Sequence, residues 1–498
     1  MPAITNIENF RASMARSLQA FYTRHGLAGQ RLGNYAANLQ ATALRLKAQG
    51  LAPCEIKRAL AAEQAPLLRF SKPFKLWGQA DFNFLTRDNW DSVFEKRSLS
   101  PSKAAFARSE QQKGLALILD GRVGFQEHYG GQGERLKIKK AKYLTNPNDL
   151  LQAYQEAGLF RTFASLADWT IGERTFINKS FELFSHCLAQ GRNVAEAKAV
   201  LASIKFKMVL SQNAGGEIVE NLVKNNFFGF QPANFIFMFQ PRHPTYGVTA
   251  DGELEADPRY PTQGNHGLTT FHSLLENQWF RVVAEEAPGG FREERLTTED
   301  YRAFQRGLTM LMYESVEDLT QYEKPFDYGF INRVARQGRE FGQLFFQQIV
   351  RQKTENPQPG GVFVHLFDKR QRLNRQAVIE SNRTGLKPEE IPVLNRGWGA
   401  IFDPNEFDRQ VVNSPMLSDL HPTFKPKGDE PVVRIESEIP FGDANLYLDS
   451  AYYVINPRIA NLKVPGDIPA ALRTLRQMEL KPGLVDFARD FLGLERSR

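Results

Sequence analysis

A glycine-rich, basic stretch at residues 130–142, GGQGERLKIKKAK, holds the side chains most clearly suited to chemistry. Its glycines allow positive φ angles and let a ligand approach the main chain closely. They are Gly130, Gly131 and Gly133. Successive N–H groups in such a loop can form a concave anion site. Arg135 can bind phosphate as a planar fork and Lys142 as a point charge. The stretch therefore suits a polyphosphate, and a basic surface loop without a ligand is the alternative.

The composition is typical of a large, well-packed protein. A chain of 498 residues exceeds one ordinary core, so we expect two or three domains. The 38 phenylalanines indicate extensive buried apolar surface. No stretch approaches roughly 18 uncharged apolar residues, and MPAITNIENF lacks the features of a secretory signal, so we expect no membrane span and no secretion. The two cysteines, Cys54 and Cys187, argue against a disulfide framework and favour a cytoplasmic location.

The charge balance admits a nucleic-acid-binding protein as an alternative. The net charge is +7, with 63 basic and 56 acidic residues interspersed along most of the chain. The densest basic cluster adjoins the glycine loop and consists of Lys137, Lys139, Lys140 and Lys142. A local field of this kind can gather a small polyanion. The sequence shows neither aromatic stacking platforms nor a recognition helix, so we expect no nucleic-acid partner.

Periodic apolar residues predict a helical N-terminal region over residues 1–100. One helix face is formed by Phe10, Met14, Leu18 and Phe21. Tyr35, Leu39 and Leu46 predict a second helix that ends near Gly50. Pro53 suits the first turn of a third helix, to about residue 62.

Short apolar runs predict an α/β domain over residues 101–410. The predicted strands are 115–119, 204–210, 235–239 and 308–312, with a helix at 217–226 and a peripheral hairpin formed by 362–367 and 377–380. The order strand, turn, helix, strand between residues 204 and 239 has the size of a βαβ unit, so we expect a largely parallel sheet. Ligands of such sheets bind beyond the carboxyl ends of the strands. A smaller C-terminal lobe, 411–498, has β-like stretches at 431–439 and 445–455 and a helix around 483–492.

The middle of the chain resembles the UTP:sugar-1-phosphate uridylyltransferases, and among them the UDP-N-acetylhexosamine pyrophosphorylases. That family carries the loop G-G-x-G-T-R-L-G-x3-P-K, and here the three glycines, Arg135, Leu136 and Lys142 fall at the matching spacing. Residues 178–190 resemble the helix that follows the loop. Residues 208–244 resemble the next strand and helix and the F-F-Q-Q-x-x-x-P strand end, with Gln240 on its second glutamine.

Four further motifs extend the resemblance to about residues 113–440. PTQGNHG at 261–267 resembles P-x-G-N-G-G with one extra residue, and SVEDL at 315–319 occupies the place of V-D-N. NRG at 395–397 resembles F-N-x-G, and KPKG at 425–428 resembles K-P-N-G. The resemblance implies a nucleotidyltransferase fold, Rossmann-like and GT-A-like, with a mixed, mostly parallel sheet.

The chain also departs from the family pattern. The predicted strand 115–119 lies about ten residues upstream of the glycine loop, and His128 and Tyr129 directly precede that loop, so either an insertion or a different register applies. Glu134 replaces the family's threonine, and Ala141 replaces its proline. The metal-binding aspartate corresponds to Glu317 or Asp318. An altered or inactive sugar-nucleotide-binding protein with a regulatory role is therefore the alternative to a working enzyme.

The resemblance implies that a sugar 1-phosphate, N-acetylglucosamine 1-phosphate or glucose 1-phosphate, attacks the α-phosphorus of UTP and releases pyrophosphate. The attacking oxygen is already ionised, so positioning and charge neutralisation dominate catalysis. By the resemblance, the glycines hold the nucleotide, and Arg135 and Lys142 bind the β- and γ-phosphates. Glu317 or Asp318 binds Mg²⁺. The remaining substrate-binding roles fall to Gln240 and Gly264 for uracil, Asn265 and Asn395 for the sugar, and Lys425 for a phosphate.

Each of these residues also has a purely structural interpretation. Gln240 can cap a strand end, and Asn395 in Asn-Arg-Gly can serve a turn. Glu317 and Asp318 can form a solvated acidic pair, and Lys425 can be a surface lysine. The histidines show no metal-ligand spacing. The sequence names neither the sugar nor an oligomeric state.

Overall fold

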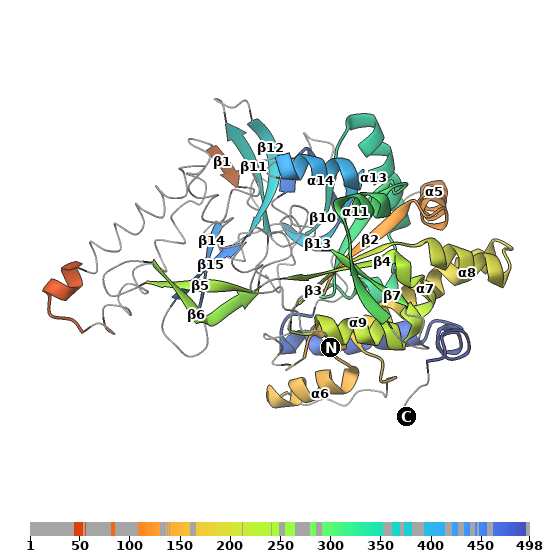
Figure 1. Ribbon diagram of the computed structural model, residues 1–498, viewed down its shortest axis with the longest axis horizontal. Helices are drawn as coiled ribbons and strands as arrows, with labels where there is room; N and C mark the ends of the chain where they lie inside the picture. Colours follow the sequence, from red (N-terminus) through yellow and green to blue (C-terminus); the bar gives the residue numbers. More distant parts are fainter. Residues whose placement is uncertain are drawn as a thin grey trace.

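A computed structural model shows the fold of the protein (Figure 1). The structure describes residues 44–52, 55, 81–84, 108–129, 136, 138, 140–159, 166–211, 213–240, 242–248, 254–263, 279–284, 291–351, 361–368, 373–380, 393–413, 421–426, 433–438, 444–445, 448–455 and 462–494. The first predicted helix and nearly all of the third lie outside these residues. The second ends as predicted, because residues 44–48 are helical and Gly50 adopts a φ of 84°.

The described residues form two sheets. The larger has twelve strands, nine of them in the order β1-β11-β13-β9-β2-β3-β4-β7-β8, with β10, β12 and β16 attached beside this path. Its strands are β1 (Asp81–Phe84), β2 (Val123–His128), β3 (Phe206–Ser211), β4 (Phe235–Gln240), β7 (Phe280–Ala284), β8 (Phe291–Arg295), β9 (Met310–Ser315), β10 (Phe345–Arg351), β11 (Gly361–Asp368), β12 (Leu373–Glu380), β13 (Val393–Phe402) and β16 (Ser450–Ile455). The smaller has the order β14-β15-β5-β6, namely β14 (His421–Pro426), β15 (Val433–Glu438), β5 (Arg242–Val248) and β6 (Leu254–Gln263).

The centre of the larger sheet is parallel and its flanks are antiparallel. β9, β2, β3 and β4 are parallel neighbours, and β10 pairs in parallel with β16. β13 joins β9 antiparallel, and β7 joins β4 antiparallel. The predicted βαβ unit is confirmed as β3, α9 (Gly215–Lys224) and β4. The predicted hairpin is also confirmed, as β11 and β12. The mixed sheet expected from the sequence is thus present, with its parallel part at the centre.

The predicted strand at 115–119 is wrong, because these residues form the last turns of the helix α5 (Arg108–Leu119). Leu115, Ile118 and Leu119 are buried there, at helical spacing. Gly121, with a φ of 66°, ends the turn after the helix. The strand is instead β2, whose sequence VGFQEH does not look like a core strand, yet all six residues are buried. No insertion is therefore needed, because β2 leads directly toward the glycine loop.

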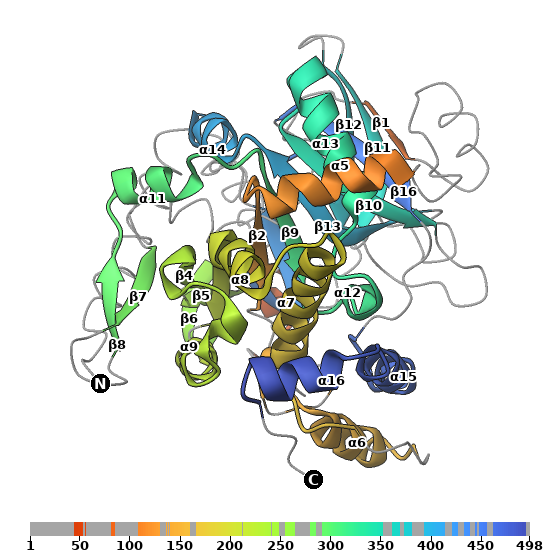
Figure 2. The same ribbon diagram turned by 90° about the vertical axis from the view of Figure 1, so that its right-hand side faces the viewer.

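Helices pack on the sheet through one large apolar core. α7 (Ile171–Ala189) and α8 (Val194–Ser203) contact each other, and α5 lies beside α13 (Tyr328–Phe341) (Figure 2). Phe125, Phe206 and Phe235, from β2, β3 and β4, belong to this core together with Phe176 of α7. Burial of such large aromatic side chains supplies much of the stabilising free energy.

The opposite face of the sheet carries a buried lysine network. The ammonium group of Lys207, on β3, donates to Tyr301 Oη at 2.5 Å and to Gln305 Oε1 at 3.2 Å. Tyr301 and Gln305 both donate to Asp408, at 3.0 and 2.7 Å. Tyr301 and Gln305 lie on α11 (Thr298–Gln305), and Asp408 lies on α14 (Pro404–Asn413). The network therefore fixes both helices to the amino-terminal half of β3.

Residues 450–455 and 462–494 pack against elements from the middle of the chain. β16 lies in the larger sheet, and α15 (Ile468–Glu479) contacts α6 (Pro147–Glu156) and α12 (Thr320–Glu323) (Figure 2). Buried Arg174 of α7 pairs with Glu479 at 2.6 Å, and Lys481 donates to Asn178 Oδ1 at 2.8 Å. α16 (Leu484–Asp486) and the π-helix Phe487–Phe491 follow and confirm the helix predicted around residues 483–492, whereas α15 was not predicted. The domain boundaries at residues 100 and 410 stay a prediction.

Candidate active site

The carboxyl ends of the four parallel strands form one edge of the sheet. In strand order they end at Ser315 of β9, His128 of β2, Ser211 of β3 and Gln240 of β4. His128 pairs with Ser315, and Ser211 pairs with Gln240. Three strand spacings, roughly 14 Å, separate β9 from β4. The loops that leave this edge are where an open α/β sheet binds its ligands.

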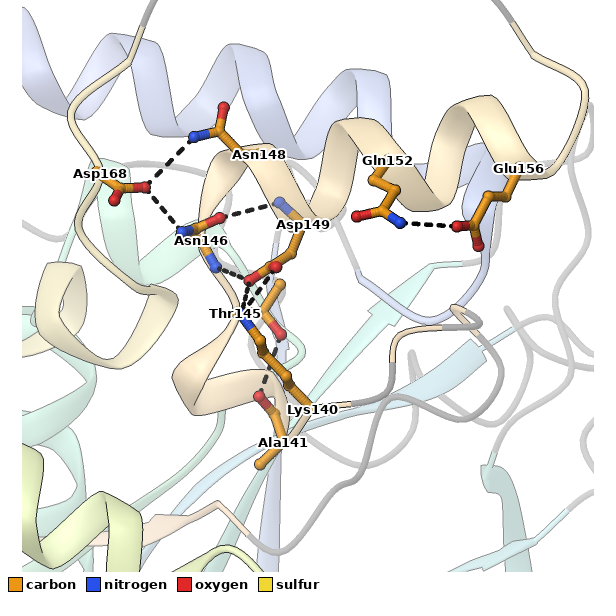
Figure 3. Close-up of polar contacts among 9 residues, drawn as sticks. All are labelled: Lys140, Ala141, Thr145, Asn146, Asn148, Asp149, Gln152, Glu156 and Asp168. Carbon is orange, nitrogen blue, oxygen red and sulfur yellow. Dashed lines mark hydrogen bonds and ion pairs between the residues drawn. The ribbon is translucent and has the colours of Figure 1, made fainter. Parts of the chain in front are cut away.

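The segment that carries Lys142 is folded back onto the core. Leu136 and Ala141 are buried, and Lys142 begins the short 3₁₀ helix η3 (Lys142–Leu144). The hydroxyl group of Thr145 donates to the carbonyl oxygen of Ala141 at 3.1 Å. Asn146 and Asp149 then form a reciprocal capping box at the start of α6 (Figure 3). These local bonds fix the backbone on both sides of Lys142.

Lysine side chains of this segment have two different environments. Lys140 is half-exposed, and its ammonium group lies 2.9 Å from Asp149 Oδ1 (Figure 3). Lys142 is 5% exposed, and its ammonium group donates to Glu317 Oε1. Only Lys142 of these two therefore reaches across to the loop that follows β9.

Glu317 accepts a second lysine, Lys463, which approaches from the C-terminal part of the chain. The ammonium group of Lys463 lies 3.2 Å from Glu317 Oε2. Burial opposes ionisation of Glu317, but the nearby charges of Lys463 and Lys142 outweigh burial and lower the pKa of its carboxyl group to about 2. The cluster Lys142–Glu317–Lys463 thus carries two positive charges and one negative charge.

Backbone bonds hold Lys463 in place. The N–H group of Leu462 donates to the carbonyl oxygen of Glu317 at 2.9 Å. The N–H group of Lys463 donates to Asp467 Oδ2 at 2.8 Å. Sequence reasoning missed Lys463, because a lysine in a proline-containing segment carries no motif or periodicity. Its role becomes visible only when the fold brings it beside Glu317.

Glu317 does not fit a resident Mg²⁺ in this arrangement. Both carboxylate oxygens of Glu317 contact ammonium groups, which repel a cation. Asp318 is 1% exposed, and its backbone N–H group donates to Ser315 at 3.1 Å. Within the residues that the structure describes, no three His, Cys, Asp or Glu side chains gather to hold a metal ion. The metal-binding role of Glu317 and Asp318 stays a prediction.

The other predicted site residues fall into two groups. Gln240 is buried at the end of β4; Asn395 lies in β13 opposite Ile349, and Lys425 lies in β14 opposite Arg434. Outside the described residues are Gly130, Gly131, Gly133, Arg135, Gly264 and Asn265. The structure therefore brings Lys142 and Glu317 together and places Gln240 at the same sheet edge.

Comparison with solved structures defines the class of fold. UDP-N-acetylglucosamine pyrophosphorylase from Trypanosoma brucei, solved with an inhibitor, is 14% identical; the match covers 81% of this chain and 80% of that chain, with a TM-score of 0.52. A putative UDP-N-acetylglucosamine pyrophosphorylase from Entamoeba histolytica matches at 15% identity over 75% and 80% of the two chains, with a TM-score of 0.46. UDP-glucose pyrophosphorylase from Leishmania major matches at 12% identity over 87% and 78%, with a TM-score of 0.47.

The match to the Trypanosoma brucei structure supports the fold alone. The protein shares its mixed α/β fold with that pyrophosphorylase structure, in agreement with the fold that the sequence predicted. No family model and no curated protein matches the chain by sequence. Among the described residues, no helix combines the length and the apolar character needed to span a bilayer.

Proposed function

We propose that this protein is a uridylyltransferase that forms a UDP-sugar and pyrophosphate from UTP and a sugar 1-phosphate. The observation that carries the proposal is the cluster Lys142–Glu317–Lys463 at the carboxyl edge of the parallel strands. Two ammonium groups held at this edge suit a polyphosphate, and the fold is one in which such chemistry occurs.

In the proposed reaction, a phosphate oxygen of the sugar 1-phosphate forms a bond to the α-phosphorus of UTP. The bond from that phosphorus to the oxygen bridging the α- and β-phosphates breaks, and pyrophosphate leaves with the electron pair. No proton must be removed from the attacking oxygen, because it is already ionised near neutral pH. The protein has to align the two substrates and neutralise the charge that develops on pyrophosphate.

We assign charge neutralisation to the basic side chains at the sheet edge. Lys142, Lys463 and Arg135 would bind the β- and γ-phosphates, and the glycine loop would contribute backbone N–H groups. A triphosphate would compete with Glu317 for the two ammonium groups, so Glu317 keeps both lysines in place until the substrate arrives. Mg²⁺ would enter as the counterion that UTP carries.

The remaining assignments follow from the sequence resemblance. Gln240 and Gly264 would bind uracil, Asn265 and Asn395 the sugar, and Lys425 a phosphate. The sugar would be N-acetylglucosamine or glucose, and the compartment would be the cytoplasm.

The decisive test is a pyrophosphate-release assay with UTP, Mg²⁺ and a panel of sugar 1-phosphates. Turnover with N-acetylglucosamine 1-phosphate or glucose 1-phosphate is expected. Thermal-shift titrations with UTP and with UDP-sugars run alongside. Stabilisation by UDP-sugars without pyrophosphate release from any sugar would replace this proposal with a catalytically inactive, sugar-nucleotide-binding protein. Absence of both effects would overturn the assignment.

A further inference from the structure

Another buried lysine, Lys179, lies close to the carboxyl ends of β2 and β9. It lies on α7 and is inserted between carboxylates of neighbouring strands, Glu127 of β2 and Glu314 of β9. Its ammonium group donates to Glu127 Oε1, and to Glu314 Oε2 at 2.7 Å. Each of the three side chains is at most 2% exposed. The ammonium group also lies 4.6 Å from the centre of the Phe125 ring.

The two carboxylates occupy equivalent places on their strands. Glu127 and Glu314 are register partners in the parallel pair β2–β9. Glu127 lies three residues before Gly130, and Glu314 lies three residues before Glu317. The two strand ends that lead to the phosphate loop and to Glu317 are therefore joined by one ammonium group. Burial lowers the pKa of Lys179, but Glu127 and Glu314 outweigh burial and raise it, so the lysine is charged.

The same face of α7 also holds the far end of the Glu317 loop. Asn178 donates to the carbonyl oxygens of Gln321 and Tyr322, at 2.7 and 3.2 Å. The hydroxyl groups of Thr175 and Tyr322 lie 3.1 Å apart. Thr175, Asn178 and Lys179 share one helical face, because they are separated by three and four residues. The segment 315–320 is thus fixed to α7 at both of its ends.

Buried ion pairs are weak sources of stability, because desolvation offsets the attraction. Apolar side chains of similar volume would hold α7 on the sheet equally well. The charged triad of Lys179, Glu127 and Glu314 adds specificity, because its hydrogen bonds fix the end of β2 relative to the end of β9.

We propose that Lys179 is a positioning residue for the nucleotidyl transfer: by joining Glu127 to Glu314 it fixes the end of β2 relative to the end of β9, the strand that leads to Glu317. This inference rests on the proposed function. Lys179 does not touch substrate in this scheme, and it acts through the loops that do.

The informative variant replaces the whole triad with apolar side chains, Lys179→Met with Glu127→Leu and Glu314→Leu. The single change Lys179→Met would leave two buried carboxylates without their cation, so unfolding of that variant would not bear on positioning. We expect the triple variant to fold with a melting temperature close to that of the wild type. Its kcat should fall at least tenfold, while KM for UTP should change less than threefold.

Lys207→Met is the matched control, since it removes a buried lysine from the same sheet away from the carboxyl edge. It should leave kcat within twofold of the wild-type value. A folded triple variant with wild-type kcat would overturn the positioning role and leave the triad as packing. Failure of the triple variant to fold would also overturn it, because the triad would then be required for stability.

Hydrogen–deuterium exchange separates failure of this inference from failure of the proposed function. Peptides that cover residues 315–323 should exchange faster in the triple variant than in the wild type or in Lys207→Met. This readout needs no turnover, so it holds even if the wild-type protein releases no pyrophosphate. Unchanged exchange in that segment would count against Lys179 as the residue that fixes it.

Discussion

The ammonium group of Lys463 lies 3.2 Å from the same carboxylate that accepts Lys142, so Glu317 joins two segments that are 321 residues apart in the sequence (463 − 142). Lys142 follows β2, whereas Lys463 precedes α15. The shared carboxylate attracts both ammonium groups and so offsets their mutual repulsion at one sheet edge. This arrangement keeps the two ammonium groups ordered around one carboxylate.

Removal of either lysine should lower transferase activity. Lys142→Ala and Arg135→Ala are each expected to lower kcat at least ~100-fold, since charge stabilisation dominates such transfers. Lys463→Ala should also lower activity, measured as kcat/KM for UTP. Steady-state pyrophosphate release measures all three. Lys140→Ala is the control, because Lys140 is half-exposed and contacts Asp149 instead, and its activity should stay within about twofold.

Dependence on Mg²⁺ distinguishes two roles for Glu317. We expect EDTA to abolish turnover, because UTP requires a divalent counterion. If Glu317 or Asp318 binds the metal, Glu317→Gln or Asp318→Asn will abolish the response of activity to Mg²⁺. If Glu317 only orders the lysines, Glu317→Gln will keep the wild-type Mg²⁺ titration midpoint and lose affinity for UTP. Undiminished turnover in EDTA would contradict both roles.

Stability should rise with pH through the titration of Lys207. Burial lowers the pKa of Lys207 to about 8, against the opposing effect of Asp408. Between this value and the pKa of about 10.4 in the unfolded chain, the unfolded state binds more protons, so the free energy of unfolding increases with pH. From pH 7.5 to 9.5 the wild type should gain about 2 kcal/mol relative to Lys207→Met. Urea denaturation of both proteins across this range measures the difference, and parallel curves would refute the shift.

The ion pair between Glu479 of α15 and Arg174 of α7 should contribute strongly to the free energy of unfolding. Glu479→Ala leaves Arg174 buried beside the carbonyl oxygens of Ala167 and Trp169, without its anionic partner. Removal of one member of a buried pair costs about 3–5 kcal/mol. Urea denaturation should show this loss. Glu406→Ala breaks an exposed Glu–Arg pair with Arg409 and should cost less than about 1 kcal/mol. Equal effects of the two substitutions would contradict the burial argument.

The sequence predicts strands well where they are apolar and poorly where buried polar groups pair with distant residues. β3 and β4 were predicted because FKMVLS and FIFMFQ are continuous core strands. β2 was missed because Gln126, Glu127 and His128 read as surface residues. In the fold Gln126 and His128 bond each other at 2.8 Å, and Glu127 meets Lys179 from another element. No local pattern reveals such pairing.

The candidate site was likewise predicted only in part from the sequence. Lys142 and Glu317 were predicted as members of one site, and they form an ion pair despite their separation of 175 residues. Lys463 and the triad around Lys179 were not predicted, because their partners are set by topology. The roles of the glycine loop, Arg135, Gly264 and Asn265 stay predictions, since these residues lie outside the described part of the chain.

The docking of Leu462 and Lys463 onto Glu317 has a consequence for biogenesis. During translation β2, β9 and α7 leave the ribosome long before Lys463 does, so the nascent chain meets its surroundings with the basic cluster incomplete. Nucleotide affinity should therefore arise abruptly, only after the last helices have emerged and packed. Ribosome-bound chains of increasing length would record that step.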